Sequence, residues 1–305
     1  MYEGVDIELP KVNIPKEEQD PHSKRLLKVC DLWDQDFSEE QIKRARRAYY
    51  GAVSYVDDCV GELLETLKDC ELDEDTIVIF SGDHGDMLGE RGLWWVVTPG
   101  ACEPVAYHPS RYKMSYFEAS VRVPLIVYHP RDFSPHRVPQ NVSTLDLLPT
   151  MCDLVGTKPE PSLPMDGLSL LPHLRGAPGH DTALAEYAGE GTVAPLVMIR
   201  RGPWKFTACP ADGPQLFHVE RDPLELHDLA RGLHKRAGAP LSADDEAAGA
   251  ALDAFEAEAA ARWDFETITR DVLLSQRKRR LVWAALKKGH FTSWDYNPED
   301  DGRTK

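Results

Sequence analysis

The sequence predicts an α/β protein, and three observations support this. A long segment of helical periodicity begins at Ser38 and runs to about residue 67. Two short apolar runs with the composition of strands follow, at residues 76–80 and 125–128. A further helical segment lies at residues 144–155. Helix, strand, loop, strand, helix is the order typical of a mostly parallel sheet flanked by helices.

The first helix has a clear start and one apolar face. Ser38 and Gln41 have the spacing of a capping box, in which the side chain of each residue accepts a hydrogen bond from the backbone N–H of the other. Apolar side chains then recur at helical spacing at Ile42, Ala45, Tyr49, Val53, Val56, Val60, Leu63 and Leu67. We expect the later helix, residues 144–155, to be interrupted at Pro149, because proline lacks a backbone N–H.

Residues 76–80 are rich in β-branched side chains, which predicts a strand buried on both faces of a parallel sheet. Asp83 and His84 follow at its carboxyl end, where open α/β sheets collect ligands and metals. An adjacent carboxylate and imidazole suit a divalent cation. Taken alone, Asp-His-Gly also fits an ordinary turn, because aspartate bonds its own backbone and glycine accepts positive φ.

The remaining segments extend this organisation. Residues 1 to about 37 are Pro-rich without periodicity, which indicates a surface segment. Short strands at 183–187, 195–200 and 204–208 predict a small antiparallel subdomain, and helices are expected at 242–262 and 266–288. The basic run 277–280 fits a helix end better than a nucleic-acid site. We therefore expect three parts, residues 1–175, 176–262 and 263–305.

Composition restricts the partners. A formal net charge of −16 argues against nucleic acid and anionic membranes, and a small cation is better matched. The six cysteines show no CxxC pair and no metal-finger spacing, so a reducing cytosol fits. The first residues lack a secretory signal, and no apolar run approaches the roughly 18 residues of a membrane span. We expect a cytoplasmic protein that contacts no membrane.

Two longer strings, residues 80–94 and 112–126, resemble the sulfatase family of the alkaline phosphatase superfamily, and within it the choline-sulfatase group. Similar stretches recur over nearly the whole chain, at residues 20–27, 44–50, 194–206, 280–283 and 291–296, and residues 216–230 look like the turn that closes the family's C-terminal sheet. The resemblance implies an alkaline-phosphatase-like fold with a small antiparallel C-terminal subdomain and a helical tail. The implied reaction converts choline sulfate and water to choline and sulfate.

The resemblance also implies the site. Asp83 and His84 match two ligands of the family's divalent metal, usually Ca²⁺, with Mg²⁺ and Mn²⁺ as alternatives. Lys113 matches the lysine that contacts the sulfate and the leaving oxygen, so His84 and Lys113 are the catalytic candidates. Lysines in this position are otherwise ordinary solvated charges.

The tail offers a substrate site. Trp294, Asp295 and Tyr296 combine aromatic faces with a carboxylate, which suits a quaternary ammonium such as choline. In choline sulfatases this tail packs toward a neighbouring subunit's active site, which implies a homo-oligomer. An ordinary packing anchor is the alternative reading of these residues.

The sequence departs from the family at two places. Sulfatases form a formylglycine nucleophile within Cys/Ser-x-Pro-x-Arg, and this chain lacks that motif; in the nearest string, residues 102–106, Ala106 replaces the arginine. Residues 95–111 separate the two similar strings, and we interpret them as a retained intron or a disordered loop. These departures indicate the C-terminal part of a sulfatase whose incomplete sheet would expose an edge and apolar surface.

Three functions follow from these observations. The first is a choline-sulfatase-like hydrolase that is inactive as this isolated fragment. The second is a non-catalytic fragment that only binds metal or associates with a sulfatase subunit. The third is a phosphoesterase or phosphomutase of the same superfamily, which shares the Asp-His-Gly element but does not explain residues 294–296.

Overall fold

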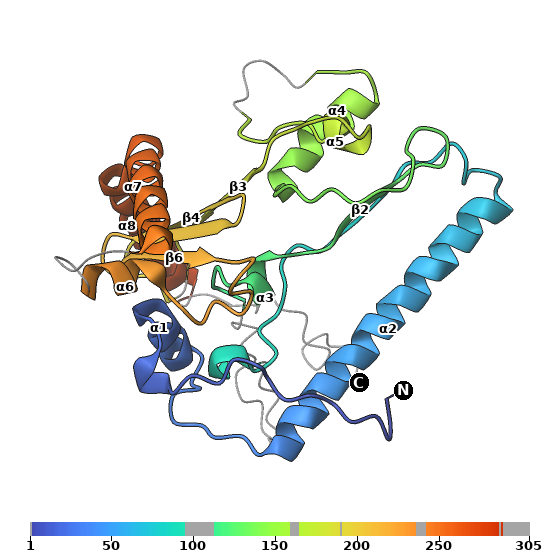
Figure 1. The fold of residues 1–305 in the computed structure, drawn as a ribbon. Coiled ribbons are helices and arrows are strands. Elements are labelled where there is room, and N and C mark those ends of the chain that lie inside the picture. Colours follow the sequence, from blue (N-terminus) through green and yellow to red (C-terminus); the bar gives the residue numbers. More distant parts are fainter. Residues whose placement is uncertain are drawn as a thin grey trace. The chain divides into compact units, whose positions relative to one another are not determined.

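A computed structural model describes residues 2–94, 113–158, 165–189, 191–235, 242–286 and 288 (Figure 1). The chain forms two compact units, Met1–Ala259 and Ala260–Lys305. The first unit contains two sheets, one of two strands and one of four. The helices and sheets confirm the predicted α/β class, while the division of the chain at 175 and 262 stays a prediction.

The first half of the chain is mainly helical around the two-stranded sheet. Its elements are α1 (Pro21–Val29), α2 (Glu39–Asp69), β1 (Val78–Ser81), α3 (Glu118–Val121), β2 (Leu125–Tyr128), α4 (Leu147–Leu154) and α5 (Leu171–Leu174), with 3-10 turns at Lys16–Glu18, Glu90–Gly92 and Thr144–Asp146. The predicted capping box is confirmed at the start of α2. The Ser38 side chain accepts from the Gln41 backbone N–H at 3.3 Å, and the Gln41 side chain accepts from the Ser38 N–H at 2.9 Å.

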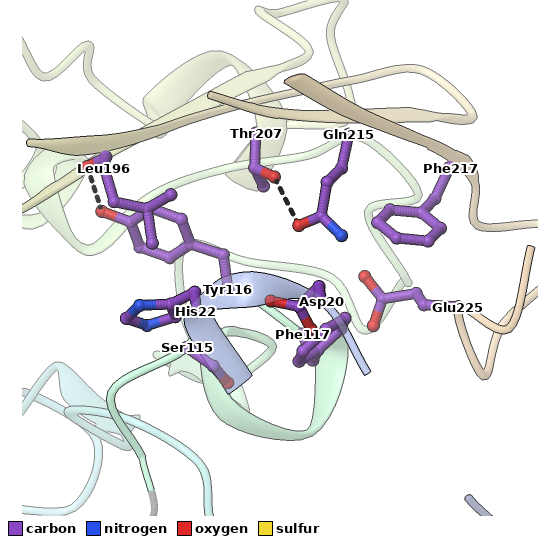
Figure 2. A pocket seen from close by; sticks show the side chains of 10 residues that line it. All are labelled: Asp20, His22, Ser115, Tyr116, Phe117, Leu196, Thr207, Gln215, Phe217 and Glu225. Carbon is purple, nitrogen blue, oxygen red and sulfur yellow. Dashed lines mark hydrogen bonds between the residues drawn. The ribbon is translucent and has the colours of Figure 1, made fainter. Parts of the chain in front are cut away.

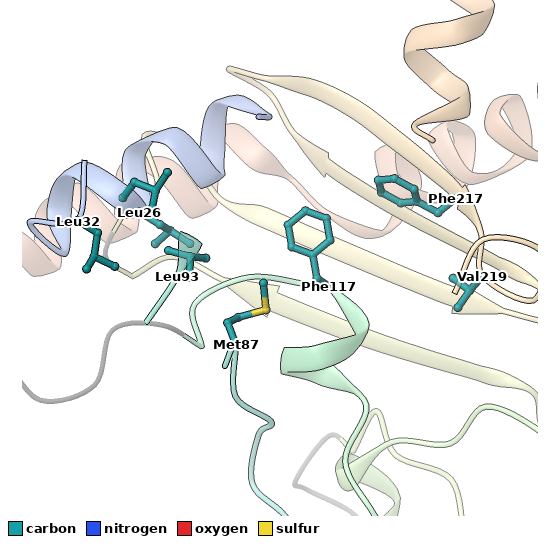
Figure 3. Packing of buried hydrophobic residues seen from close by; sticks show 8 residues of the cluster. Leu26, Leu32, Met87, Leu93, Phe117, Phe217 and Val219 are labelled. Carbon is teal, nitrogen blue, oxygen red and sulfur yellow. The ribbon is translucent and has the colours of Figure 1, made fainter. Parts of the chain in front are cut away.

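The prediction of a surface segment at residues 1–37 is wrong. Helix α1 lies in this segment, capped by Asp20, and Leu26 and Leu27 are fully buried in it. They pack in a core cluster with Leu32, Met87, Leu93, Phe117, Phe217 and Val219 (Figure 3). The helix is nine residues long, and its aliphatic residues, Leu26, Leu27 and Val29, all lie in its last turn, so periodicity could not reveal it. The Asp20-Pro21 start, by contrast, is a recognisable helix signal.

The strands of the smaller sheet differ from the prediction. β1 and β2 pair antiparallel, with Phe80 opposite Ile126, and no other strand of the described residues joins them. Phe80, Ile126 and Tyr128 are exposed, so the expected burial on both faces of a parallel sheet is wrong for this chain. The apolar composition of such a run shows that it is suited to a buried strand. Whether the strand is buried depends on which other strands and helices lie beside it.

The larger sheet confirms the predicted antiparallel arrangement. It consists of β3 (Thr182–Tyr187), β4 (Leu196–Arg201), β5 (Trp204–Cys209) and β6 (Gly213–His218), in that order. The start of the predicted closing turn at residues 216–230 belongs instead to strand β6. Helix α7 (Ala243–Arg262) stacks Phe255 on Phe206 of β5, with ring centroids 5.7 Å apart.

The other helices agree largely with expectation. α6 (Leu229–Lys235) precedes α7, and α8 (Phe265–Leu286) follows it, which confirms the two predicted C-terminal helices. Pro149 does not interrupt α4, because it lies in the first turn, where its missing N–H has no partner to lose. The 3-10 turn Thr144–Asp146 runs directly into α4. Among the described helices, none has both the length and the apolar composition that crossing a membrane requires.

A buried ion network joins the larger sheet to the segment before β2. Lys205 of β5 is buried, and its Nζ donates to Glu225 Oε1 at 2.8 Å and to the Tyr116 carbonyl at 2.9 Å. Lys205 also pairs with Glu118, whose backbone N–H donates to Glu225 Oε2 at 2.7 Å. Burial raises the pKa of Glu225, although Lys205 acts to lower it. The network therefore holds α3 against β5.

Replacing the buried lysine tests the importance of this network. We expect Lys205→Met to lower the free energy of unfolding by about 3–5 kcal/mol, because it leaves the buried Glu225 and the half-buried Glu118 without their cation. Urea denaturation measures this change. The matched control is Lys43→Met, which breaks a 2.8 Å pair with the exposed Asp6 and should change stability little. Equal losses in the two variants would contradict the assignment.

Candidate active site

Asp83 and His84 lie at the end of β1, as predicted, and contact each other. The His84 backbone N–H donates to Asp83 Oδ1 at 2.9 Å, and His84 Nε2 lies 3.2 Å from Asp83 Oδ2. His84 Nδ1 lies 3.0 Å from the Gly85 carbonyl oxygen. Because a carbonyl oxygen only accepts, this contact assigns the proton to Nδ1 and leaves Nε2 as an acceptor.

Lys113 completes this cluster. Its Nζ contacts His84 Nε2, so an ammonium donor meets the free lone pair of the imidazole. Burial tends to raise the pKa of Asp83, but the hydrogen bond from the His84 backbone and the nearby His84 and Lys113 side chains hold it below its ordinary value. The structure thus brings together Asp83, His84 and Lys113, three residues that sequence reasoning selected. Two acceptors 3.2 Å apart need a cation beside them, and Lys113 provides one.

Ser120 of α3 positions both sides of the cluster. Its carbonyl accepts from the Gly85 backbone N–H at 2.6 Å, and its hydroxyl donates to the Lys113 carbonyl. Ser120 is buried, so water competes little for these bonds. Gly85 permits the close approach, because a Cβ at this position would lie 2.1 Å from the Ala119 carbonyl oxygen. Sequence reasoning missed Ser120, which has no local signal of its own.

The cluster fits part of a metal site. Asp83 is exposed and offers carboxylate oxygens, and His84 offers Nε2 once Lys113 moves aside. No group of three or more His, Cys, Asp or Glu side chains in the described ranges is arranged to hold a metal ion. Since Ca²⁺ takes about 6–8 oxygen ligands, these two side chains provide only part of a coordination shell.

Asp86 lies beside the same turn and was also missed. Its Oδ1 is buried, lies 3.8 Å from His84 Nδ1, and has no hydrogen-bond partner among the described residues. Burial, followed by the interaction with the Asp86 side chain, raises the pKa of Tyr49 in α2 to about 12. The position of Asp86 within the Asp-His-Gly-Asp string was the available signal.

A separate pocket, lined by polar and apolar side chains, lies between α1, the segment before α3 and the larger sheet (Figure 2). It encloses about 310 Å³ including open solvent, and its lining residues are Asp20, His22, Ser115, Tyr116, Phe117, Leu196, Thr207, Gln215, Phe217 and Glu225. None of Asp83, His84 and Lys113 lines it. The pocket is therefore not the predicted site.

Residues 95–111 and the predicted substrate residues Trp294, Asp295 and Tyr296 lie outside the described residues.

Comparisons with known proteins agree on the family. The model of the sulfatase family matches residues 15–157, and that of the choline sulfatase C-terminal region matches residues 270–305. The chain is 41% identical over 302 residues to the choline-sulfatase of Rhizobium meliloti (strain 1021), covering 98% of this chain and 53% of that protein. It is 36% identical to mouse (Mus musculus) arylsulfatase K over 64% of this chain and 34% of the relative. The chain thus spans about half the length of the choline-sulfatase and about a third of the length of arylsulfatase K.

Two solved structures share the fold. A 2-O GAG sulfatase, BT1596, matches with a TM-score of 0.61 at 22% identity, over 89% of this chain and 55% of that one. The phosphonate monoester hydrolase of Agrobacterium radiobacter matches with a TM-score of 0.60 at 23% identity, over 83% and 51%. At these identities the likeness concerns the fold alone. It confirms the predicted alkaline-phosphatase-like architecture.

Two glycines of the same turn provide a matched test of the site's geometry. We expect Gly85→Ala to lower the free energy of unfolding by about 1–3 kcal/mol, because its Cβ would collide with the Ala119 backbone. Gly82→Ala should be tolerated, since its Cβ would meet Val123 at an ordinary 3.5 Å. Urea denaturation gives both stabilities, and hydrogen exchange of the Gly85 amide reports the bond to Ser120. Equal tolerance of both changes would show that the turn is not held by this close approach.

Proposed function

Since this chain belongs to the sulfatase family, we propose that it provides the metal-and-lysine part of a sulfuric ester hydrolase that releases sulfate from choline sulfate. The observation that carries the proposal is the contact of the Lys113 ammonium with His84 Nε2, beside the Asp83 carboxylate. The identity of 41% to a choline-sulfatase and the match of residues 270–305 support the choice of substrate.

The chemistry of the reaction explains why these groups belong together. Hydrolysis of a sulfate ester develops negative charge on the leaving oxygen and leaves it on the sulfo oxygens, so fixed positive charge stabilises the transition state. When bound, a divalent metal supplies such charge as a Lewis acid, and Asp83 and His84 would be two of its ligands. Lys113 would donate an N–H to the sulfo group and to the leaving oxygen.

The turn prepares these side chains for that task. The bond between His84 Nδ1 and the Gly85 carbonyl fixes the imidazole ring and directs Nε2 toward Lys113. Ser120 fixes the Lys113 backbone. The imidazole ring and the Lys113 backbone lose little conformational freedom when substrate binds, which lowers the entropic cost of reaching the transition state. Only the Lys113 side chain has to move from His84 Nε2 to the sulfo group.

The nucleophile is the missing part of the proposal. The formylglycine motif of the family does not occur in this sequence, and Asp83 and His84 leave most of a metal's coordination shell unfilled. We therefore propose that this chain turns over substrate only together with a polypeptide that supplies the nucleophile and the other ligands. Without it the chain would act as a non-catalytic fragment that binds metal or a subunit.

For the substrate, we propose that Trp294, Asp295 and Tyr296 bind the quaternary ammonium of choline, and that the tail associates with a second subunit. These residues belong to the region that matches the choline sulfatase C-terminal model. The likeness of fold to a phosphonate monoester hydrolase keeps a phosphoester substrate as the second candidate.

The activity test combines this chain with the part of the R. meliloti choline-sulfatase that lies outside the match, in the presence of Ca²⁺ and choline sulfate. We expect sulfate release from the mixture and none from this chain alone. Lys113→Ala should lower kcat about 100- to 1000-fold, because it removes one fixed charge at the transition state. Lys158→Ala, an exposed lysine, is the control and should change nothing. Retained activity in Lys113→Ala would contradict the role of Lys113.

The substrate test uses the same mixture with Asp295→Ala. We expect KM for choline sulfate to rise about tenfold, since a carboxylate facing a quaternary ammonium is lost, and KM for an aryl sulfate without a cationic group to stay nearly constant. Steady-state kinetics on both substrates measures this. An equal loss on both would remove Asp295 from choline recognition. Preferred turnover of a phosphate diester in the same assay would favour the second candidate function.

A further inference from the structure

Helix α1 contains a buried histidine that contacts the segment of Lys113. His22 lines the pocket of Figure 2 and is 6% exposed. Its Nε2 lies 2.6 Å from the carbonyl oxygen of Met114, the residue that follows Lys113. Because a carbonyl oxygen only accepts, this contact assigns the proton to Nε2, which is the donor. His22 lies in residues 20–27, a stretch that resembles the family but contributes no side chain to the candidate site.

The bond from His22 is one of several that hold the same segment. Carbonyl oxygens from Lys113 onward accept hydrogen bonds from buried side chains of α1, α3 and β5. The pairs are Ser120 to Lys113, His22 to Met114 at 2.6 Å, and Lys205 to Tyr116 at 2.9 Å. Since the donors are buried, water competes little for these carbonyls. Three separate elements therefore fix the path of the backbone after Lys113.

The bond to Met114 has a specific effect on Lys113. A single hydrogen bond at the Lys113 carbonyl holds one point, and the backbone can still turn about that point. A second bond, on the next carbonyl, opposes this rotation, because each peptide unit is planar and only φ and ψ of Met114 lie between the two. A lysine side chain is long and flexible, so its ammonium reaches one place reliably only when its backbone is held.

Helix α1 is a firm base for this donor. Leu26 and Leu27 are fully buried in the core cluster. Arg25 pairs with Asp212 in the turn between β5 and β6, with Nη1 donating to Oδ1 at 2.8 Å. The helix is thus anchored to the core on one side and to the larger sheet on another, and His22 transmits this support to Met114.

The other ring nitrogen of His22 shows what a histidine provides here. Nδ1 is buried and has no hydrogen-bond partner among the described residues. A buried acceptor without a donor costs free energy, whereas an apolar side chain would fill the same space without that cost. The ring packs edge-on against Tyr187 of β3, with centroids 6.3 Å apart, which an apolar ring could also do. The bond to the Met114 carbonyl is therefore the contact that requires a donor at this position.

We propose that His22 is a positioning residue of the candidate active site. By holding the Met114 carbonyl it keeps the Lys113 ammonium beside His84 Nε2. His22 itself contacts none of Asp83, His84 and Lys113 through its side chain and transfers no proton. The inference goes beyond the proposed function and rests on it only for the catalytic role of Lys113.

The experiment records the ¹⁵N chemical shift of His84 Nε2 in the full chain labelled with ¹⁵N-histidine. A ring nitrogen that accepts from an ammonium group resonates apart from one that water alone solvates, and Lys113→Met gives the reference for the lost contact. We expect His22→Leu to move the signal most of the way to this reference. His22→Gln should keep the original shift, because its amide N–H reaches about as far as imidazole Nε2. His22→Asn, whose amide ends near the position of Nδ1, should behave as His22→Leu does.

The control variant is His173→Leu. His173 lies in α5, is 4% exposed and also has a ring nitrogen without a hydrogen-bond partner among the described residues. Its replacement removes a comparable buried imidazole but should leave the His84 signal unchanged. An unmoved signal in His22→Leu, or an equal displacement in His173→Leu, would overturn the proposal. If His22→Leu does not fold, the other pair decides, and equal shifts in His22→Gln and His22→Asn would overturn it.

Kinetics connects this positioning to the reaction. In the mixture with the rest of the R. meliloti choline-sulfatase, His22→Leu should lower kcat about 10- to 100-fold, since a displacement of about 1 Å at a reacting group has effects of this size. His22→Gln should restore most of kcat. An unchanged kcat in His22→Leu would contradict the positioning role. A mixture with the unchanged chain that releases no sulfate would refute the proposed function, while the His84 shift would still decide the role of His22.

Discussion

The backbone hydrogen bond from Gly85 to the Ser120 carbonyl is the contact on which the candidate active site depends. At 2.6 Å it joins the turn after β1 to α3, although the two segments are separated in the sequence by residues 95–112. The Ser120 hydroxyl holds the Lys113 carbonyl in the same place. One buried residue thus determines the distance between the His84 imidazole and the Lys113 ammonium.

The buried ion network extends this support to the larger sheet. Lys205 of β5 and Glu225 hold Glu118 and Tyr116, and Glu118 begins the short helix that contains Ser120. The four-stranded sheet therefore supports the candidate site only through α3. None of Asp83, His84 and Lys113 belongs to that sheet. The buried lysine is costly to remove, because Glu118 and Glu225 then lose the cation that they share. The network thereby supports the geometry of the candidate site.

Sequence patterns predicted the elements better than their surroundings. The period of α2, the capping box at Ser38 and the short C-terminal strands follow from local sequence, and the structure confirms them. The pairing and exposure of β1 and β2 depend on which strands lie beside them. The local sequence of a strand does not specify its neighbours. The Asp83-His84 pair follows from its position after a strand, whereas the choice of Lys113 required the resemblance to a family. Lys205 was missed because a lysine within a strand has no signature until its carboxylates are placed.

Asp83, His84 and Lys113 form one cluster after the end of β1. The most direct measurement of the central claim is the location of selenate, a sulfate analogue, by anomalous scattering in crystals of this chain together with the rest of the R. meliloti choline-sulfatase, soaked with Ca²⁺ and selenate. The account predicts selenium next to Lys113 Nζ, on the side that Asp83 and His84 face. Selenate bound elsewhere, for example in the pocket beside Asp20 and His22, with Lys113 still against His84, would contradict it.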